Sequence, residues 1–162
     1  MKESFDMAEK IEIQTADKQI LNALQQDGRI SNQDLAERSA MSASACWRRV
    51  KALEEAGVIE RYTALVNPEA VGLSFHAMVH VVLSRHQAGH VENFIEAVMT
   101  RPEVLDCFAT TGDADYHLRI RCRDLAAYNE FLEEFMFALE GVSTVKTNLI
   151  LRQLKHETRL VV

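Results

Sequence analysis

The sequence predicts an α+β fold in two parts, a three-helix winged helix-turn-helix domain followed by a ferredoxin-like β-α-β-β-α-β domain. Two observations predict this division. Apolar residues recur at helical spacing between Thr15 and Gly57, and from Phe75 onward strand-like and helix-like spacings follow one another. In addition, only Arg38–Met41 connects the second and third predicted helices, and so short a connection makes consecutive helices cross steeply.

Composition excludes several classes of protein. The 162 residues are 48% hydrophobic, which suffices for packed cores, and no stretch reaches the roughly 18 consecutive apolar residues of a membrane span. The first residues mix charges where a signal peptide would be apolar, so we expect a cytoplasmic protein with no membrane partner. Cys46, Cys107 and Cys122 lack CxxC spacing and are expected to be reduced thiols. The formal net charge of −6 argues against non-specific coating of nucleic acid.

Local signals mark the ends of the three N-terminal helices. Asp27-Gly28 ends the first, Ser31 caps the second, Ser42 caps the third, and Gly57 stands where a helix end favours positive φ. The apolar residues expected to face the core of this domain are Ile20, Leu21, Leu24, Leu35, Ala36, Cys46, Val50 and Leu53.

A short segment rich in β-forming residues follows the third helix. Val58-Ile59 and Tyr62–Val66 predict a small hairpin beside that helix, and Asn67-Pro68 with Gly72 indicates a linker. The expected boundaries are an extension of unassigned role at 1–14, the helix-turn-helix domain at 15–61, a hinge at 62–73, and the second domain at 74–162.

The second domain is predicted to contain four strands and two helices. The strands are expected at Phe75–Leu83, Val104–Thr111, Tyr116–Cys122 and Val145–Leu154, and the helices at Val91–Met99 and Leu125–Leu139. Each helix has one apolar stripe, so both pack most economically on the same face of the sheet. The other face then exposes residues such as Met78 and Val82, which a partner subunit would cover. We therefore expect at least a dimer.

The third predicted helix carries a basic face. It contains Arg48, Arg49 and Lys51, and no acidic residue lies between Ser42 and Leu53. Arginine reads guanine edges in the major groove, and serine hydroxyls near a helix N-terminus bind phosphate. The candidate residues for binding a double-stranded DNA operator are Ser42, Ser44, Trp47, Arg48, Arg49 and Lys51.

Two other interpretations of this helix remain open at this point. An isolated basic helix is often only a solvated surface. A single tryptophan offers no stacking platform for bases, so Trp47 is not expected to stack on them. It could equally pack against the phosphate backbone or lie in the core. The short turn and the helix lengths favour DNA binding.

Five segments resemble the leucine-responsive regulatory protein (Lrp/AsnC, or feast/famine) family. They are DGRISN at Asp27–Asn32, LAER at Leu35–Arg38, CWRRVKALE at Cys46–Glu54, YTALVNP at Tyr62–Pro68 and TGDADY at Thr111–Tyr116. Together they extend over nearly the whole chain from Thr15 onward. Many family members have prolines near the start of the third helix, where this chain has Ser42–Ala45, and this departure concerns base preference.

The resemblance implies a bacterial or archaeal transcription regulator that is cytoplasmic and associated with the nucleoid. In such a protein the C-terminal domain, of the RAM or ACT-like type, dimerises and assembles further, often into an octamer that is a tetramer of dimers. A small amino-acid effector, leucine-like or another, binds between dimers, and no other cofactor is implied. The resemblance places the effector loop at Gly112, Asp113, Asp115 and Tyr116.

The chemistry of this loop suits an amino acid. Gly112 lets backbone amides approach a carboxylate, Asp113 or Asp115 can accept from the ammonium group, and Tyr116 or Leu118 could wall the pocket. The complete set of candidate effector residues is Thr111, Gly112, Asp113, Asp115, Tyr116, Leu118, Asn148 and Ile150. Taken without the resemblance, Gly-Asp between two strands indicates an ordinary hairpin turn.

Two other functional classes find less support in the sequence. An enzyme or metal site finds little support, because His76 and His80 share a strand face but stand roughly 13 Å apart at ~3.3 Å per residue, too far to bind one metal. We therefore expect no catalytic residue and no metal. A stand-alone amino-acid-binding oligomeric module without DNA binding is the alternative function. It would require residues 15–57 to be a mere helical appendage, against which the basic face argues.

Overall fold

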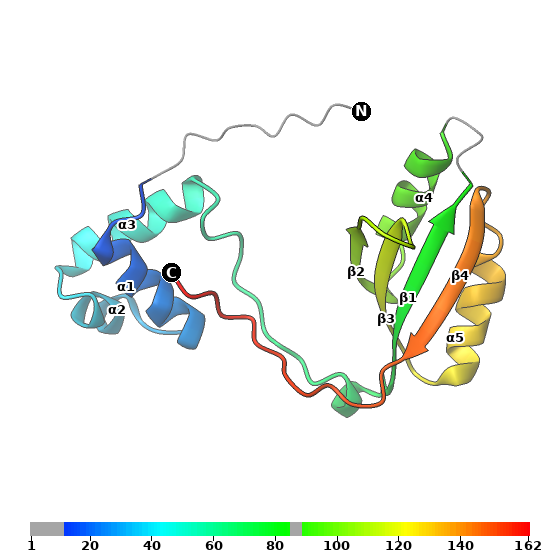
Figure 1. Ribbon diagram of the computed structural model, residues 1–162. Helices are drawn as coiled ribbons and strands as arrows, with labels where there is room; N and C mark the ends of the chain where they lie inside the picture. The colour runs from blue at the N-terminus through cyan, green and yellow to red at the C-terminus, as the bar shows by residue number, and fades with distance from the viewer. Residues whose placement is uncertain (1–11, 85–88) are drawn as a thin grey trace. The chain divides into compact units, whose positions relative to one another are not determined.

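The computed structural model describes residues 12–84 and 89–162 (Figure 1). The chain divides into two compact units, of which the first extends to Leu65 and includes His156–Val162, and the second comprises Val66–Lys155. The expected second domain, 74–162, thus differs from the observed unit at its C-terminal end. Most of the expected N-terminal extension lies outside the described residues. Within the described part of the chain, no helix is long and apolar enough to cross a membrane.

Three helices form the first unit, as the sequence predicts. They are α1 (Thr15–Gln26), α2 (Asn32–Arg38) and α3 (Ala43–Glu55). Ser31 caps α2 by accepting a hydrogen bond from the Asp34 amide, and Ser42 caps α3 by accepting one from the Ala45 amide. The buried apolar residues of the unit are Ile20, Leu21, Ala23, Leu35, Ala36, Cys46 and Leu53.

The turn between α2 and α3 contains a residue in the left-handed conformation. Ala40 has a φ of 53°, and it is the one residue other than glycine with positive φ in the described chain. This conformation lets the chain reverse between two helices in very few residues, but a Cβ atom disfavours it. Gly57 also adopts positive φ, at 70°, where the sequence predicts such a residue after α3.

The small hairpin predicted after α3 does not form in the described chain. The amides of Val58 and Ile59 both donate to the carbonyl of Leu53, at 2.9 and 3.1 Å, so their backbone groups close the end of α3. Residues 60–66 follow without assigned strand structure. The β-forming side chains therefore lie in a connection that pairs with no strand among the described residues.

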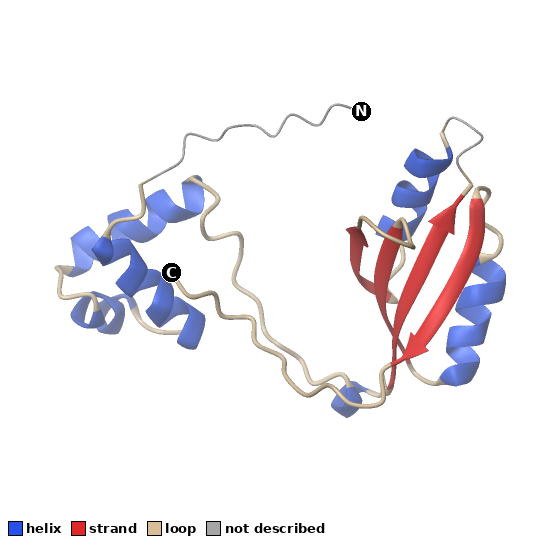
Figure 2. Cartoon of the chain, in the orientation of Figure 1, coloured by secondary structure: helices blue, strands red, loops and turns tan. Residues whose placement is uncertain are grey.

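The second unit is a four-stranded antiparallel sheet with two helices (Figure 2). Its strand order is β2-β3-β1-β4, so the first strand occupies an interior position. The elements are η1 (Glu69–Val71), β1 (Phe75–Leu83), α4 (His90–Met99), β2 (Val104–Ala109), β3 (Tyr116–Cys122), α5 (Leu125–Phe131), η2 (Leu132–Met136) and β4 (Val142–Leu149).

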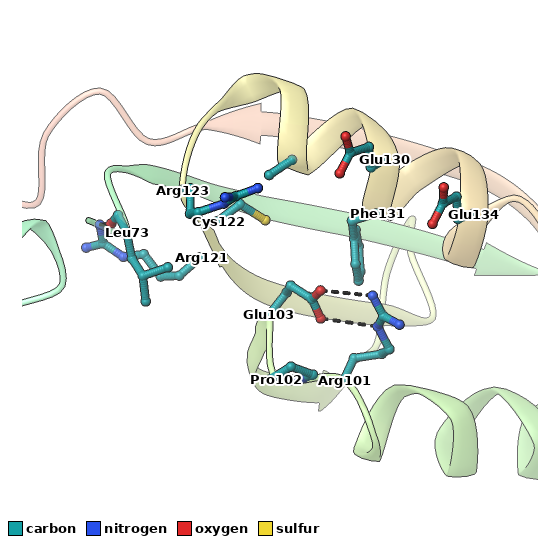
Figure 3. A pocket seen from close by; sticks show the side chains of 11 residues that line it. Leu73, Arg101, Pro102, Glu103, Arg121, Cys122, Arg123, Glu130, Phe131 and Glu134 are labelled. Atoms are coloured by element: carbon teal, nitrogen blue, oxygen red, sulfur yellow. Dashed lines mark hydrogen bonds and ion pairs between the residues drawn. The ribbon is translucent and has the colours of Figure 1, made fainter. Parts of the chain in front are cut away.

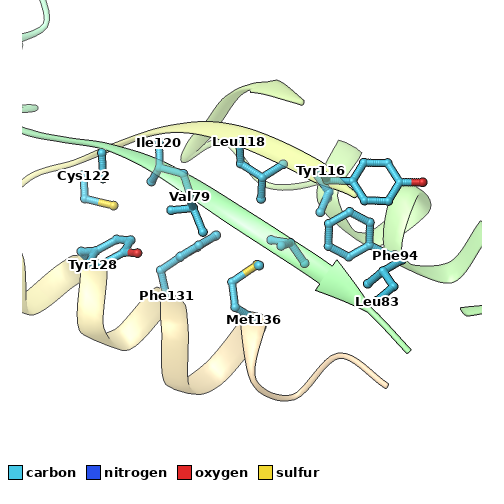
Figure 4. Packing of buried hydrophobic residues seen from close by; sticks show 13 residues of the cluster. Val79, Leu83, Phe94, Tyr116, Leu118, Ile120, Cys122, Tyr128, Phe131 and Met136 are labelled. Atoms are coloured by element: carbon cyan, nitrogen blue, oxygen red, sulfur yellow. The ribbon is translucent and has the colours of Figure 1, made fainter. Parts of the chain in front are cut away.

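Both helices pack on one face of the sheet, as predicted. Alternate residues of β1 and β3 point toward the helices, and Figure 4 shows Val79, Leu118 and Ile120 meeting Phe131 and Met136. The predicted second helix is interrupted, because α5 passes into the π-helical turn η2. This turn shifts the helical register so that Met136 is fully buried, where simple helical spacing points to Phe135.

The opposite face of the sheet is more polar than the sequence analysis expects. By strand alternation it presents Met78 and Val82, but also polar and charged neighbours. These neighbours are His76, His80, Asp106, His117, Arg119, Arg121, Thr144, Lys146 and Asn148. The face is therefore mixed and not wholly apolar: Met78, Val82 and the 52% exposed Phe108 lie among hydrogen-bonding and charged groups, and any partner on this face would meet both.

The segment that contains η1 is anchored to one end of this polar face. The buried guanidinium of Arg121 donates to Glu69 of η1 at 2.9 Å and to the carbonyl of Leu73 at 3.3 Å. A hydrogen bond from its own backbone, and then the one from Arg121, lower the pKa of Glu69. Burial, and then the charge of Arg121, lower the pKa of the neighbouring His76. The region around Glu69 thus belongs to the second unit.

The positive φ of Ala40 should lower the stability of the first unit. Replacing Ala40 by Gly should raise the free energy of unfolding of the first unit by about 0.5–1 kcal/mol, because glycine adopts positive φ without strain. Ala52→Gly is the matched control, since this exposed residue lies inside α3 and its replacement should cost about 1 kcal/mol. Denaturant titration followed by the fluorescence of Trp47 measures both. Equal destabilisation by the two variants would contradict the assigned strain.

Candidate functional site

The outer face of α3 is the first candidate site. Ser42, Ser44, Trp47, Arg48 and Lys51 are all exposed, and we call this set the basic face. Ser42 and Ser44 lie at the positive N-terminal end of the helix, with their hydroxyl oxygens 3.3 Å apart. Arg48 forms no ion pair with another described residue, so its guanidinium is available to a partner.

Arg49 differs from its neighbours because it points toward α1. Its guanidinium donates to Asp17 at 2.7 Å and to the side-chain oxygen of Gln14 at 2.6 Å. Asp17 is 5% exposed and also accepts the amide hydrogen of Gln14, so it needs a cation beside it. The structure therefore ties Arg49 to the start of α1, and the basic face lacks this predicted residue.

The position of Trp47 decides between the two interpretations that the sequence leaves open. Its side chain is 54% exposed, which excludes a core position within the unit. The ammonium group of Lys51 lies 5.5 Å from the centre of its ring, in a cation–π contact. The indole thus lies on the basic face beside two cations, where it can pack against a phosphate backbone.

The loop between β2 and β3 is the second candidate site. Gly112 has a φ of 127°, a conformation that requires glycine. Thr110 closes the loop, because its amide donates to the carbonyl of Asp115 and its hydroxyl donates to the carbonyl of Ala114. The Asp115 carboxylate accepts the amide hydrogen of Leu83 at 2.8 Å. Asp115 therefore holds the loop to the end of β1.

A cavity of about 590 Å³ lies between this loop and the polar face of the sheet. We call it the sheet-face cavity. Three of the predicted effector residues line it, namely Thr111, Asp113 and Asn148. The remaining lining residues are His80, Val82, Ala114, His117, Thr144 and Lys146. The cavity thus combines a carboxylate, an ammonium group, hydroxyls, imidazoles and a small apolar surface.

Three other predicted effector residues lie elsewhere. Tyr116 and Leu118 point to the helix-covered side of β3, where Tyr116 packs on Phe94 with ring centres 4.8 Å apart (Figure 4). Ile150 donates its amide hydrogen to the carbonyl of His76 and does not line the cavity. The expectation that Tyr116 or Leu118 walls the pocket does not fit this geometry, because strand alternation turns both residues toward the core.

The histidines of the sheet-face cavity are not among the effector residues predicted from the sequence. His80 on β1 and His117 on β3 are paired across the strands, and their ring centres are 4.4 Å apart. The His80 ring also lies 3.0 Å from the Asn148 amide nitrogen. Alternation along each strand could have assigned both to one face. Their proximity depends on the strand register, which the sequence pattern alone does not determine.

A further cavity of about 360 Å³ lies between α5 and the start of β2 (Figure 3). Arg101 donates two hydrogen bonds to Glu103, at 2.9 and 3.1 Å, and its guanidinium lies over the ring of Phe135. Arg101 is thus fully engaged within the chain. No sequence motif indicates this cavity.

Metal and cysteine chemistry find no support in the described residues. Within 12–84 and 89–162, no three His, Cys, Asp or Glu side chains are grouped to hold a metal ion. Cys46, Cys107 and Cys122 are free thiols, and burial raises the pKa of each. A raised thiol pKa disfavours the reactive thiolate.

Both units match known protein families. Residues 13–60 match a family described as winged helix-turn-helix DNA-binding, and residues 76–160 match the Lrp/AsnC ligand binding domain. The chain is 39% identical over 146 residues to the leucine-responsive regulatory protein of Escherichia coli K12, which covers 90% of this chain and 89% of that protein. The protein of the same name from Klebsiella pneumoniae matches with the same identity and coverage.

Solved structures agree with this relationship. A transcriptional regulator from Neisseria meningitidis, crystallised as a complex with L-Met, superposes with a TM-score of 0.88 at 38% identity, covering 92% of this chain and 96% of that one. An AsnC family transcriptional regulator from Agrobacterium tumefaciens gives a TM-score of 0.85 at 33% identity, covering 91% and 95%. With both of its units matched over nearly their full length, the chain belongs to the Lrp/AsnC family of transcription regulators.

Proposed function

We propose that the protein regulates transcription by binding a DNA operator through α3 and by responding to a small amino acid bound at the sheet-face cavity. The observation that carries this proposal is that one chain holds both an exposed basic helix face and a cavity with zwitterion-binding groups. Membership of the Lrp/AsnC family supports the same function, and its relatives are regulators rather than enzymes. We further propose that it acts on the bacterial nucleoid.

The basic face supplies the groups that DNA recognition needs. In the proposed complex, Ser42 and Ser44 contact phosphate at the helix N-terminus, and Trp47 with Lys51 packs along the backbone. Arg48 is the residue proposed to read a base edge, because arginine donates two hydrogen bonds to guanine. Arg49 supports this surface from behind by fixing α3 to α1 through Asp17.

The sheet-face cavity offers a complementary group for each part of an amino acid. We propose that Asp113 accepts from the ammonium group and that Lys146 binds the carboxylate. Val82 and Ala114 offer apolar contact to a side chain. The names of relatives refer to leucine, and a solved neighbour holds L-Met, so we propose an apolar effector of similar size.

We propose that the effector acts through assembly. A ligand shifts an equilibrium between assemblies only as far as it prefers one of them, and such coupling typically amounts to about 1–3 kcal/mol. Dimers, and a tetramer of dimers, are the proposed assemblies, with residues 62–73 as the hinge. The alternative of a stand-alone amino-acid-binding module is not favoured, because it leaves the basic face of a matched DNA-binding domain without a role.

Arg48 and Arg49 provide a matched test of the DNA interface. Arg48→Ala should weaken operator binding by about 1–3 kcal/mol and leave folding unchanged, because its side chain contacts only the partner. Arg49→Ala should instead lower the free energy of unfolding by about 1–3 kcal/mol, because it leaves the Asp17 carboxylate buried without its cation. Gel-shift titration at fixed salt and thermal unfolding separate the two effects. Full operator affinity in Arg48→Ala would remove this residue from the interface.

Asp113 tests the effector site. A thermal-shift screen of the standard amino acids identifies the ligand, since a molecule bound only to the folded state raises stability. Asp113→Ala should then lower the affinity of the protein for that amino acid by roughly tenfold or more, because a hydrogen bond to a charged group is worth about 1.5–3 kcal/mol. Calorimetry measures this loss, with Glu133→Ala as the control, an exposed carboxylate on η2 outside the cavity. Unchanged affinity in Asp113→Ala would reduce this aspartate to a turn residue.

A further inference from the structure

The last seven residues of the chain pack within the first unit, far in sequence from the helices that they contact. The residues His156–Val162 group with the three-helix unit, although they follow the last strand of the sheet. Two hydrogen bonds fix this packing. The side-chain amide of Gln25 on α1 donates to the carbonyl of Leu160 at 3.0 Å, and the Leu160 amide donates back to the Gln25 oxygen at 2.6 Å.

This reciprocal pair resembles the pairing of two strands. A glutamine side chain offers one donor and one acceptor, and here it satisfies both backbone groups of a single residue in the tail. Such a contact excludes a shift of the tail by one residue, because successive residues of an extended segment direct their backbone groups to opposite edges.

An apolar groove lies beneath this contact. It is formed by Leu21 and Leu24 of α1 and by the extended connection after α3, including Val58, Ile59 and Leu65. Leu160 and Val162 line the groove with one side of their side chains, at 72% and 38% exposure, whereas Val161 between them is fully exposed and does not line it. This alternation is that of an extended segment with one face on an apolar surface.

We propose that His156–Val162 is a docking segment for the groove between α1 and the connection after α3. Two stretches of chain then join the units, the hinge after α3 and the tail after β4. The connection in the groove also contacts α3, because the Tyr62 hydroxyl donates to Glu54 at 2.9 Å. Burial, and then the hydrogen bond and charge of Glu54, raise the pKa of Tyr62 to about 12, so this hydroxyl remains a donor at neutral pH.

The tail provides a direct route between the two sites, a point that rests on the proposed function. Lys146 and Asn148 of the sheet-face cavity lie on β4, and the chain continues from this strand into the docked tail. A ligand that repositions β4 therefore acts on a segment bound to α1. We propose that the tail transmits the effector signal to the first unit.

Hydrogen–deuterium exchange of the full chain tests docking without reference to any ligand. The double variant Leu160→Asp with Val162→Asp should exchange faster by about tenfold in α1 and residues 58–65, with β1 and β3 unchanged. Val161→Asp is the matched control, because it adds the same charge to a side chain that contacts nothing. Equal exchange in the double variant and the control would overturn the docking.

A crosslinking experiment tests whether the tail docks on its own chain. Gln26→Cys with Val161→Cys, exposed neighbours of Gln25 and Leu160 that leave the hydrogen-bonded pair intact, should crosslink through a short bismaleimide in a Cys107→Ser background to a product of one-chain mass. A product of two-chain mass would overturn docking within one chain and assign the groove to the tail of a second copy.

Transmission of the effector signal through the tail is tested by a separate measurement of operator affinity. The double tail variant should keep the amino-acid affinity of the natural chain but lose most of the effector-dependent change in operator affinity. A full effector response in this variant would overturn transmission through the tail. If the natural chain bound no amino acid, the proposed effector would be refuted. The exchange experiment would still decide whether the tail is docked.

Discussion

The ion pair between Asp17 and Arg49 determines which residues of α3 remain free for recognition. A buried carboxylate must be paired, and the nearest cation that α3 offers is Arg49. Once Arg49 faces α1, helical geometry turns Trp47, Arg48 and Lys51 to the outside. The same contact reaches Gln14 at the start of α1, so one guanidinium fixes the helix N-terminus and the orientation of the basic face together.

Strand alternation plays the corresponding role in the second unit. Along β1, every second side chain enters the helix-covered core, and the residues between them lie on the opposite face, where His80 and Val82 line the sheet-face cavity. The two aspartates in the loop between β2 and β3 also differ in what their side chains contact. The Asp115 carboxylate accepts the amide hydrogen of Leu83, whereas Asp113 lines the cavity and is the aspartate that we propose as the ligand contact.

Sequence reasoning predicted the elements better than it predicted the sites. The bounds of β1 and β3 were predicted correctly, because alternation and flanking turns determine a strand without reference to tertiary structure. The hairpin after α3 was wrong, since Val58 and Ile59 donate to Leu53 instead of to a partner strand. Arg49, Tyr116 and the pair of His80 with His117 depend on packing or register, which no local pattern contains. The docking of the tail also depends on tertiary packing, because its partner Gln25 lies 135 residues earlier in the sequence.

DNA binding and amino-acid binding are proposed to be coupled in one chain. Fluorescence anisotropy with an operator selected from random duplexes measures this coupling, when the dissociation constant is determined at increasing concentrations of the amino acid found by thermal shift. We predict a change of about 5- to 150-fold between the free and saturated protein. A dissociation constant that stays the same at saturating amino acid, with binding of that amino acid verified by calorimetry in the same buffer, would contradict the account.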